Sequence, residues 1–559
     1  MKLKGAQILI KTLKEQGVSC IFGYPGATVI DIYDALMNDG DGIEHILTAD
    51  EQGAASAADG YARATGRVGV ALATSGPGAT NLVTGIATAF MDSIPMIAIT
   101  GNVKSSLIGR DAFQEIDITG ITIPITKHNF FVDRIDRLEE TIRKAFQIAQ
   151  SGRPGPVLID IPQDIQQAEY EYEAKEPYAL EEIIKASDED IKKAADMICE
   201  AKRPYIYFGG GALRADIGTE LMALSDKSGA YLGCSMMGLS LIPTDYPRFL
   251  GMQGMHGHFA ASVALAKSDL LIAVGVRFSD RATGNTDRFA LNPRKIHIDC
   301  DRTEIGKNVN VDLGVQCDIK DFIVRLTDAI EEKKLPEWDE RIASLLERET
   351  DAYDDKDFLP RAVLEFIADN SEADTRLVTD VGQHQMWSAQ FYKFRQKRTW
   401  ISSGGLGTMG FGMGAAIGAS IGSKKPSVLI TGDGSFGMDL NELATAVTYN
   451  VPLIIVIFNN RVLGMVRQWQ TLFYDKHYSG TEINRKTDFK ALAEAFGAKG
   501  YKADNIDEFK SAFLNAKKTD GPCVIDLAVD EDAMVLPMLR PGGTFDNLVT
   551  WKEAEENDQ

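Results

Sequence analysis

Two oxygen-bearing side chains, Asp433 and Asn460, follow hydrophobic runs in the last third of the chain. Residues 428–431 lead directly into Gly-Asp-Gly-Ser at 432–435, and residues 452–458 end at Asn-Asn. The stretch between them suits one helix and one return strand, so both side chains can meet where neighbouring parallel strands end. Carboxylate and amide oxygens, together with diphosphate oxygens, are ligands that Mg²⁺ prefers. The pattern therefore predicts a Mg²⁺ site that holds a diphosphate beside the start of a helix.

A Gly-Asp-Gly turn alone would be weak support for such a site. Asp-Gly turns are common, and Asp433 could simply cap the helix that follows it. The Asn-Asn pair at the end of the next strand favours the metal site. The sequence contains no G-x-x-x-x-G-K-[S/T] pattern and no strand-linked G-x-G-x-x-G pattern, so neither common nucleotide motif is indicated.

The elements that must position these residues form an α/β pattern. Short apolar runs, as at 68–73 and 157–161, alternate with longer helical patterns, which is typical of parallel sheets covered by helices. Two acidic and weakly periodic stretches, at about 169–190 and 331–357, are interpreted as linkers. The expected architecture is three doubly wound domains with mainly parallel sheets, at residues 1–170, 185–340 and 360–559.

Composition excludes several classes of protein. The 559 residues are 44 % hydrophobic and 25 % charged, as in a water-soluble globular protein. The net charge of -21 argues against nucleic acid and anionic membranes as partners. The six cysteines form no C-x-x-C pair, so neither a zinc site nor a disulfide framework is indicated.

The first residues and the longest uncharged segment indicate where the protein is located in the cell. The first residues lack the apolar core of a signal peptide, so a cytoplasmic protein is expected. Residues 404–422 carry no charge, but their eight glycines indicate close approach of the backbone to a ligand or another helix instead of a membrane span.

With the pattern at Asp433 and Asn460, the sequence resembles the thiamine-diphosphate enzymes over nearly its whole length. In that family the C-terminal domain holds the cofactor through Mg²⁺, and the N-terminal domain of a partner subunit presents a glutamate to the aminopyrimidine ring. The resemblance implies this role for Glu51, which follows the run 44–48. By position alone, a glutamate at a helix start would interact only with the helix dipole. The resemblance also implies the Val462 carbonyl as a third protein ligand of Mg²⁺, and at least a dimer.

Four separate segments resemble one branch of that family, the acetohydroxyacid or acetolactate synthases. They are Asp-Ala-Phe-Gln-Glu at 111–115, Gly-Val-Arg-Phe-Ser-Asp-Arg at 275–281, Thr-Met-Gly at 408–410 and Gly-Met-Val-Arg-Gln-Trp-Gln at 464–470. The resemblance implies decarboxylation of pyruvate and transfer of the hydroxyethyl unit to a second pyruvate or to 2-ketobutyrate. It also implies a role in branched-chain amino acid biosynthesis, a homodimer or tetramer, and a small regulatory subunit.

The resemblance implies three groups of site residues. The group around the reacting substrates is Glu51, Phe113, Gln114, Lys127, Arg281 and Trp469. The group around thiamine diphosphate is Tyr24, Pro25, Gln383, His384, Gly407, Met409, Gly434, Ser435, Gly464 and Met465, with Asp433, Asn460 and Val462 on Mg²⁺. The group around FAD is Arg153, Gly209, Gly210, Gly211, Met255, His256, Gly275, Arg277, Asp299 and Asp318. Taken singly, most of these residues could be ordinary core or surface positions.

Two departures from the family pattern and three alternatives stay open. Ser279 stands where the family usually has Asp, which puts one flavin contact in question, and Met413-Gly414 stands where Leu-Pro is usual. The alternatives are a pyruvate oxidase-type flavoenzyme, a catabolic acetolactate synthase without FAD, and a non-catalytic subunit. The segments 464–470 and 275–278 argue against the first two, and the presence of Glu51, Asp433 and Asn460 argues against the third.

Overall fold

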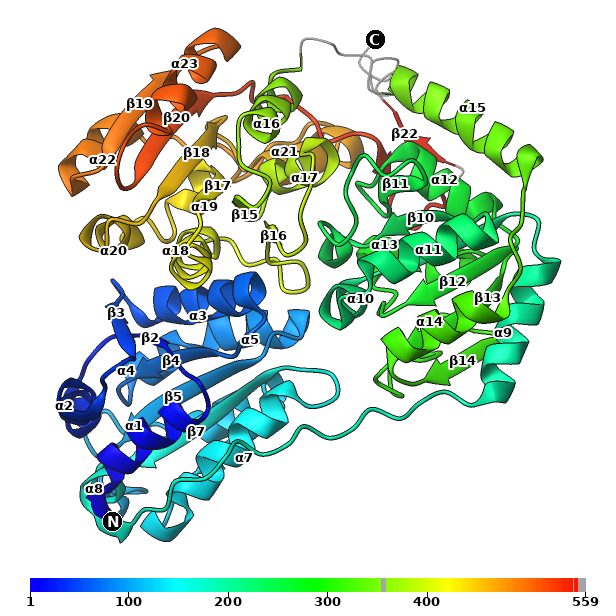
Figure 1. Cartoon of the computed structure of the whole chain (residues 1–559). Helices are drawn as coiled ribbons and strands as arrows, with labels where there is room; N and C mark the ends of the chain where they lie inside the picture. The colour runs from blue at the N-terminus through cyan, green and yellow to red at the C-terminus, as the bar shows by residue number, and fades with distance from the viewer. Residues whose placement is uncertain (353–357, 546, 551–559) are drawn as a thin grey trace.

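The computed structural model describes residues 1–352, 358–545 and 547–550. Three six-stranded sheets, all with parallel pairing, form three domains that lie side by side (Figure 1). Each sheet falls inside one of the three expected domain ranges, so the α/β fold class is confirmed. No helix among the described residues is long and apolar enough to cross a membrane.

The N-terminal sheet has the order β3-β2-β4-β5-β7-β6. Its strands are β3 (Glu44–Leu47), β2 (Cys20–Gly23), β4 (Gly69–Ala73), β5 (Met96–Asn102), β7 (Pro156–Pro162) and β6 (His128–Phe131). One face buries the apolar sides of α1 (Gly5–Glu15), α2 (Ile30–Asp39) and α7 (Leu138–Gln150). The other face buries α3 (Glu51–Thr65) and α5 (Val83–Asp92).

The central sheet has the order β11-β10-β9-β12-β13-β14. Its strands are β11 (Phe249–Met252), β10 (Tyr231–Cys234), β9 (Pro204–Phe208), β12 (Leu270–Val274), β13 (Arg294–Asp299) and β14 (Leu313–Gln316). Its faces are covered by α9 (Asp188–Glu200), α11 (Gly218–Ser228) and α14 (Ile319–Ala329) on one side, and by α12 (Phe259–Lys267) with α15 (Pro336–Ala352) on the other.

The C-terminal sheet has the order β16-β15-β17-β18-β20-β19. Its strands are β16 (Trp400–Ile401), β15 (Arg376–Thr379), β17 (Ser427–Gly432), β18 (Leu453–Asn459), β20 (Cys523–Ala528) and β19 (Lys499–Ala503). One face packs on α16 (Leu359–Asp369), α17 (Gln383–Phe391) and α23 (Ile506–Ala516), and the other packs on α18 (Gly412–Ser423), α20 (Glu442–Thr448) and α22 (Phe489–Phe496).

Helix α18 of the C-terminal domain packs directly on α3 of the N-terminal domain. A Cβ atom at Gly418 would overlap the Ala57 carbonyl, and one at Gly414 would lie 2.6 Å from the Gly53 carbonyl oxygen. The two backbones therefore touch, which only glycine permits. This confirms that the glycines of 404–422 serve a close helix contact. The Met413-Gly414 departure falls inside the buried first turn of α18.

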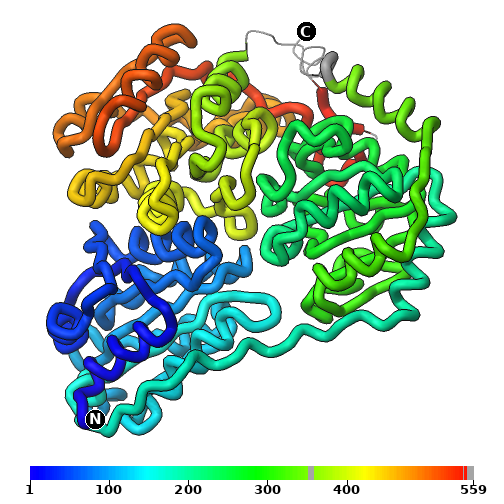
Figure 2. Tube along the Cα trace, in the orientation of Figure 1, coloured from blue at the N-terminus to red at the C-terminus, as the bar shows by residue number. Residues whose placement is uncertain are grey.

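The first expected linker is largely correct and the second is wrong. Strand β8 (Glu169–Glu171) pairs with β1 (Lys2–Lys4), and 172–187 then runs without a helix to the central domain (Figure 2). Much of 331–357 is instead the helix α15, whose Trp338, Ile342 and Leu345 are buried. Their helical spacing was masked by the surrounding acidic residues. Residues 353–357 lie outside the described part of the chain.

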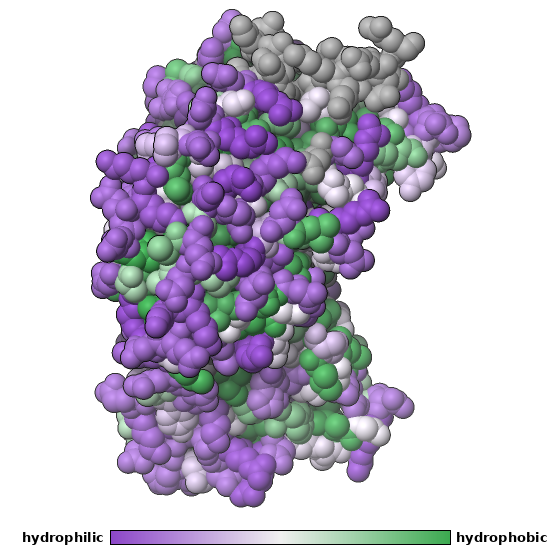
Figure 3. Space-filling model, turned by 90° about the vertical axis from the view of Figure 1, so that its right-hand side faces the viewer, coloured by the Kyte–Doolittle hydropathy of each residue, from purple (hydrophilic) through white to green (hydrophobic). Residues whose placement is uncertain are grey.

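The end of the chain crosses to the central domain. Strands β21 (Met538–Leu539) and β22 (Leu548–Val549) form an antiparallel pair whose side chains join the central-domain core. The Leu539 N–H donates to the Met255 carbonyl at 2.8 Å. The side of the molecule nearest the central domain is mostly hydrophilic, with apolar residues in small groups (Figure 3), as expected for a net charge of -21.

Candidate active site

Asp433 and Asn460 lie at the ends of neighbouring strands. Asp433 follows β17 and Asn460 follows β18, and these strands pair in parallel with Gly432 opposite Phe458. Burial raises the pKa of Asp433 to about 6, while N–H groups of Gly434 and Arg461 oppose that shift. A bound divalent cation would favour the ionised carboxylate. The pairing that the sequence predicted is therefore present, with a carboxylate that needs a positive partner.

Asn460 is fixed by two hydrogen bonds. Its amide nitrogen donates to Gln383 Oε1 at 3.3 Å, and its oxygen accepts from the Val462 N–H at 3.2 Å. A Cβ atom at Gly464 would overlap Gln383 Oε1, so this glycine lets the next turn close on the amide pair. The oxygens of Asp433 and Asn460, with the backbone of Val462 beside them, fit the hard-ligand set of Mg²⁺.

One cavity of about 1150 Å³ extends from this metal-type site to the central domain. Its volume exceeds the roughly 300–1,000 Å³ of ordinary ligand pockets, which leaves room for two cofactors. From the C-terminal domain it is lined by Gln383, His384, Gly407, Met409, Asp433, Gly434, Ser435, Asn460, Val462, Gly464, Met465 and Trp469. From the other domains it is lined by Arg153, Gly210, Gly211, Met255, His256, Gly275, Arg277, Ser279, Arg281, Asp299 and Asp318.

One buried polar atom without a partner belongs to a cavity-lining residue near the metal-type site. This atom is Nε2 of His384, and burial lowers the pKa of this ring to about 3, so the imidazole is neutral. Met409 reaches towards Gly434, with 3.7 Å between its methyl and a Cβ built on that glycine. Trp469, in α21 (Gly464–Phe473), packs edge-on against Phe473 at 5.3 Å. These groups fit a polar ligand held against an apolar wall.

The central end of the cavity is shaped by touching glycine turns. A Cβ atom at Gly211 would lie 2.7 Å from the Gly275 Cα, and Gly275 itself has φ +58°. Gly209 also lies close to Gly275, with 2.6 Å between a Cβ built on Gly209 and the Gly275 carbonyl oxygen, but it does not line the cavity. Nε2 of His256 is buried without a partner, and burial raises the pKa of Asp299 to about 6. Turns without side chains beside unsatisfied polar atoms suit a dinucleotide.

Glu51 belongs to a second cluster of residues. It is the first residue of α3, is 7 % exposed, and accepts a hydrogen bond from Asn81 at 2.9 Å. Tyr24 and Pro25 follow β2 nearby, and Gln114 touches Gly76 after β4. Of the described residues, none in this Glu51 cluster, Phe113 included, lines the cavity beside Asp433.

Lys127 lies outside the Glu51 cluster, although the resemblance placed it in the same group as Phe113 and Gln114. Its amine donates to the Ser151 carbonyl at 2.8 Å, and also to that of Ile148, at the end of α7. Burial and the charge of Arg214 lower its pKa to about 8. Its role at the substrate entrance stays a prediction. Arg281, in contrast, lines the cavity and keeps a largely exposed guanidinium group beside Met255.

Several residues that line the cavity were not predicted from the sequence. Arg63, Asp92 and Ser93 line the cavity from the N-terminal domain, and Glu304 lines it from the central domain. Arg153 pairs with Glu304 at 2.5 Å and with the Ser93 hydroxyl at 2.8 Å. No motif or spacing in the sequence indicates these positions.

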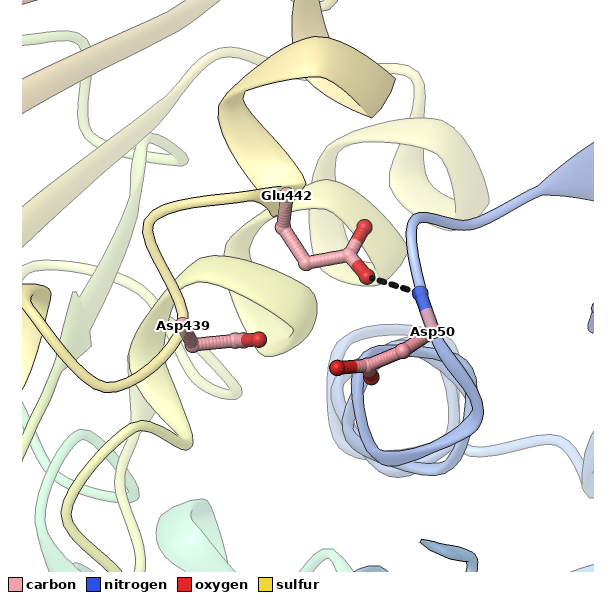
Figure 4. Close-up of side chains that lie close together, drawn as sticks. All are labelled: Asp50, Asp439 and Glu442. Carbon is pink, nitrogen blue, oxygen red and sulfur yellow. Dashed lines mark hydrogen bonds between the residues drawn. The ribbon is translucent and has the colours of Figure 1, made fainter. Parts of the chain in front are cut away.

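Three carboxylates meet where the N-terminal and C-terminal domains touch, outside this cavity. Asp439 and Glu442 come from the C-terminal domain and face Asp50 across the interface (Figure 4). Glu442 accepts from the N–H groups of Ala49 and Asp50 at 3.0 and 3.2 Å. Oδ2 of the buried Asp439 has no partner. Burial, aided by the neighbouring acids, raises the pKa of Asp439, and burial raises that of Glu442 to about 7, so the group holds a proton near neutral pH.

Asp439→Asn should weaken the pH dependence of stability. The folded chain keeps a proton that the unfolded chain has released above about pH 4.5, so the contribution of this group to stability is fully present below that pH and is lost as pH rises through about 7. Between pH 5 and 8, we expect the unfolding temperature of the variant to fall by about 2–4 °C less than that of the wild type. Thermal unfolding at several pH values measures this. Asp133→Asn, at an exposed ion pair, is the control, and equal losses in wild type and Asp439→Asn would contradict the prediction.

Three family models match most of the chain in order. They are the thiamine pyrophosphate enzyme N-terminal TPP binding domain at 3–121, the central domain at 191–326, and the C-terminal TPP binding domain at 380–527.

Full-length relatives carry consistent names. A probable acetolactate synthase large subunit of Methanocaldococcus jannaschii is 46 % identical, over 98 % of this chain and 95 % of the relative. The acetolactate synthase large subunit of Haemophilus influenzae is 41 % identical over the whole of both chains. The acetolactate synthase isozyme 2 large subunit of Escherichia coli K12 is 42 % identical, over 98 % and 99 %. The chain therefore belongs to the thiamine pyrophosphate enzymes, in the family of acetolactate synthase large subunits.

Proposed function

We propose that this chain is the catalytic subunit of an acetolactate synthase. It decarboxylates pyruvate and transfers the hydroxyethyl unit to a second pyruvate or to 2-ketobutyrate, giving 2-acetolactate or 2-aceto-2-hydroxybutyrate. The observation that carries the proposal is one cavity that joins Asp433 and Asn460 to Arg281 and Trp469, in a chain similar to acetolactate synthase large subunits over its full length.

The residues around Asp433 would hold thiamine diphosphate. Asp433, Asn460 and the Val462 carbonyl would bind Mg²⁺, and the Gly434 and Ser435 N–H groups start the short helix α19 (Asp433–Phe436) beside the diphosphate. Bound thiamine diphosphate supplies a carbon nucleophile and an electron sink for decarboxylation. Met409 would support its thiazolium ring, and Gln383 and His384 would supply polar contacts to the phosphates.

The rest of the cavity would select and shield the substrates. Arg281 offers a cation to the carboxylate of the second 2-keto acid, and Trp469 forms an apolar wall next to it. Helix α21, which lines the cavity through Gly464, Met465 and Trp469, would keep water away, which limits early protonation and release of acetaldehyde. Two pyruvates and one proton then give one acetolactate and one CO₂.

The separation of the Glu51 cluster from the Asp433 cavity supports an assembly with active sites between subunits. Phe113 is 84 % exposed and Tyr24 is 42 % exposed in the single chain. Large apolar side chains at such exposure favour coverage by a partner. We propose a homodimer or tetramer in which Glu51, Gln114 and Phe113 of one subunit complete the cavity of another, and a small regulatory subunit, because the relatives are named large subunits.

FAD would occupy the central end of the cavity. The touching turns at Gly211 and Gly275, with Arg153, Met255 and His256, provide the space and polar groups for a flavin dinucleotide. Ser279 lines the same wall, so its hydroxyl takes the place that a carboxylate has in the family pattern. Because the proposed reaction has no net oxidation, the flavin would support the structure of the site.

Product identification tests the proposal. The protein incubated with pyruvate, Mg²⁺, thiamine diphosphate and FAD should form acetolactate and one CO₂ for every two pyruvates consumed. Adding 2-ketobutyrate should give 2-aceto-2-hydroxybutyrate. Acetate with peroxide or a reduced acceptor would instead identify the pyruvate oxidase-type alternative, which the similarity to acetolactate synthases does not favour. Omitting FAD separates the flavin assignment from the reaction class.

A further inference from the structure

The segment 402–411 joins β16 to α18 and carries two of the residues assigned above to thiamine diphosphate. Gly407 and Met409 line the cavity, and Met409 reaches over Gly434. The segment has no helix or strand of its own after Ile401 and before Gly412, so contacts from elsewhere must fix its position.

Asp92 of the N-terminal domain supplies such contacts. It is the last residue of α5, and its carboxylate is completely buried. Oδ2 accepts the Gly404 N–H at 2.9 Å, and Oδ1 accepts the Gly405 N–H at 2.7 Å. A buried carboxylate with two backbone donors is a strong and directional anchor, because charge-assisted hydrogen bonds are shorter than neutral ones.

Arg63, at the end of α3, connects Asp92 to both ends of the segment. Its Nη2 donates to Asp92 at 2.9 Å, and its Nη1 donates to the Ser402 carbonyl at 2.9 Å. Its guanidinium carbon stands 5.4 Å from the centre of the Phe411 ring, and Asp59 neutralises its other edge. Two buried carboxyl groups share this buried guanidinium, and the N–H groups of Gly404 and Gly405 supply further donors to Asp92.

The segment also lies too close to α5 for side chains. A Cβ atom at Gly405 would be 2.9 Å from Asp92 Oδ1 and 2.9 Å from the Met91 carbonyl oxygen. Beside these glycines, the hydroxyls of Thr88 and Thr408 are 2.7 Å apart. Thr88 is one turn before Asp92 in α5, and Thr408 directly precedes Met409, so the same helix holds the segment at two points.

We infer that Asp92 is a positioning residue for thiamine diphosphate. Held by Arg63, it fixes Gly404 and Gly405, and through them places Gly407 and Met409 against the cofactor site of its own chain. The inference rests on the proposed function. The N-terminal domain would then have two roles. Glu51, at the start of α3, is proposed to complete the cavity of the partner subunit, and Arg63, near the end of α3, helps to shape the cavity of its own chain.

Asp92→Asn tests the inference through cofactor affinity. Trp387 and Trp469 line the cavity, so quenching of their fluorescence reports binding of thiamine diphosphate with Mg²⁺ without any turnover. We expect about 10–100-fold weaker binding, as for other residues that support the residues around a metal. The KM for thiamine diphosphate should rise in parallel, while the KM for pyruvate at saturating cofactor stays within about twofold of wild type, a split that a general loss of structure does not produce.

A second variant and a control make the result decisive. Thr88→Val keeps the side-chain shape and removes the hydroxyl, which contacts Thr408 and also donates to the Thr84 carbonyl of its own helix, so affinity should fall about threefold or more. Glu15→Gln breaks another buried ion pair of the same domain, with Arg143, and should leave cofactor affinity unchanged. Asp92→Asn and Thr88→Val with wild-type affinity would overturn the inference, and if Asp92→Asn does not fold, Thr88→Val alone decides. Failure of the wild type to bind thiamine diphosphate would instead overturn the proposed function.

Discussion

Glu51→Gln should lower the turnover number with pyruvate by about 10²–10⁴-fold, the usual contribution of a positioned acid or base. Glu51 is 7 % exposed and fixed by Asn81, so its carboxyl can be held in one orientation towards an aminopyrimidine nitrogen. Glutamine has nearly the same shape but cannot exchange a proton there. Steady-state turnover, with exchange of the thiazolium proton followed by NMR, measures the effect.

The same variant should retain its fold and bind thiamine diphosphate with Mg²⁺ nearly as tightly as wild type. Glu44→Gln, at an exposed position at the start of β3 in the same domain, is a matched control and should be fully active. If proton exchange in Glu51→Gln proceeds at the wild-type rate, Glu51 does not have the proposed role, even if turnover falls for another reason.

Asp433→Ala should abolish metal-dependent binding of thiamine diphosphate. The variant removes the charged ligand from a site otherwise built of amide and backbone oxygens, and several kcal/mol of metal binding corresponds to a loss of at least about 100-fold in affinity. Titration of the cofactor in the presence and absence of Mg²⁺ measures this loss. In the wild type, a chelator should give the same loss, and added Mg²⁺ should reverse it.

The control for Asp433 lies in the same sheet, two strands away. Asp526 of β20 is also largely buried, but it accepts a hydrogen bond from Asn459 and does not line the cavity. Asp526→Asn should therefore change cofactor affinity by less than about threefold, a difference of well under 1 kcal/mol. Equal losses in Asp526→Asn and Asp433→Ala would indicate damage to the sheet instead of loss of a metal ligand.

The sequence predicted the meeting of Asp433 and Asn460 because their positions depend on local rules. A strand, a helix and a return strand most often form neighbouring strands of a parallel sheet, so their ends come together with no knowledge of the other domains. The glycine contact of α18 was predictable for a similar reason, since eight glycines in an uncharged stretch have few other structural uses. The expected domain ranges came instead from the acidic stretches at 169–190 and 331–357, and the second of these is mostly the helix α15.

Features that depend on contacts between domains were not predictable. Asp92 and Gly404 are far apart in the sequence, and neither lies in a recognisable motif. The acidic group of Asp50, Asp439 and Glu442 likewise arises only when two domains meet. Lys127 was assigned by resemblance alone, and the fold directs its amine to the end of α7. Helix α15 was mistaken for a linker because average charge outweighed its sparse apolar spacing.

The contact between α3 and α18 also affects how the protein is made. Helix α3 ends at Thr65 and α18 begins at Gly412, so about 350 residues must be synthesised before the two helices can meet. At roughly 5–20 residues per second, the alanine-rich face of α3 waits on the order of 20–70 seconds without its partner helix. During that time the face of α3 that packs on α18 stays uncovered, and transiently exposed apolar surface of this kind favours aggregation.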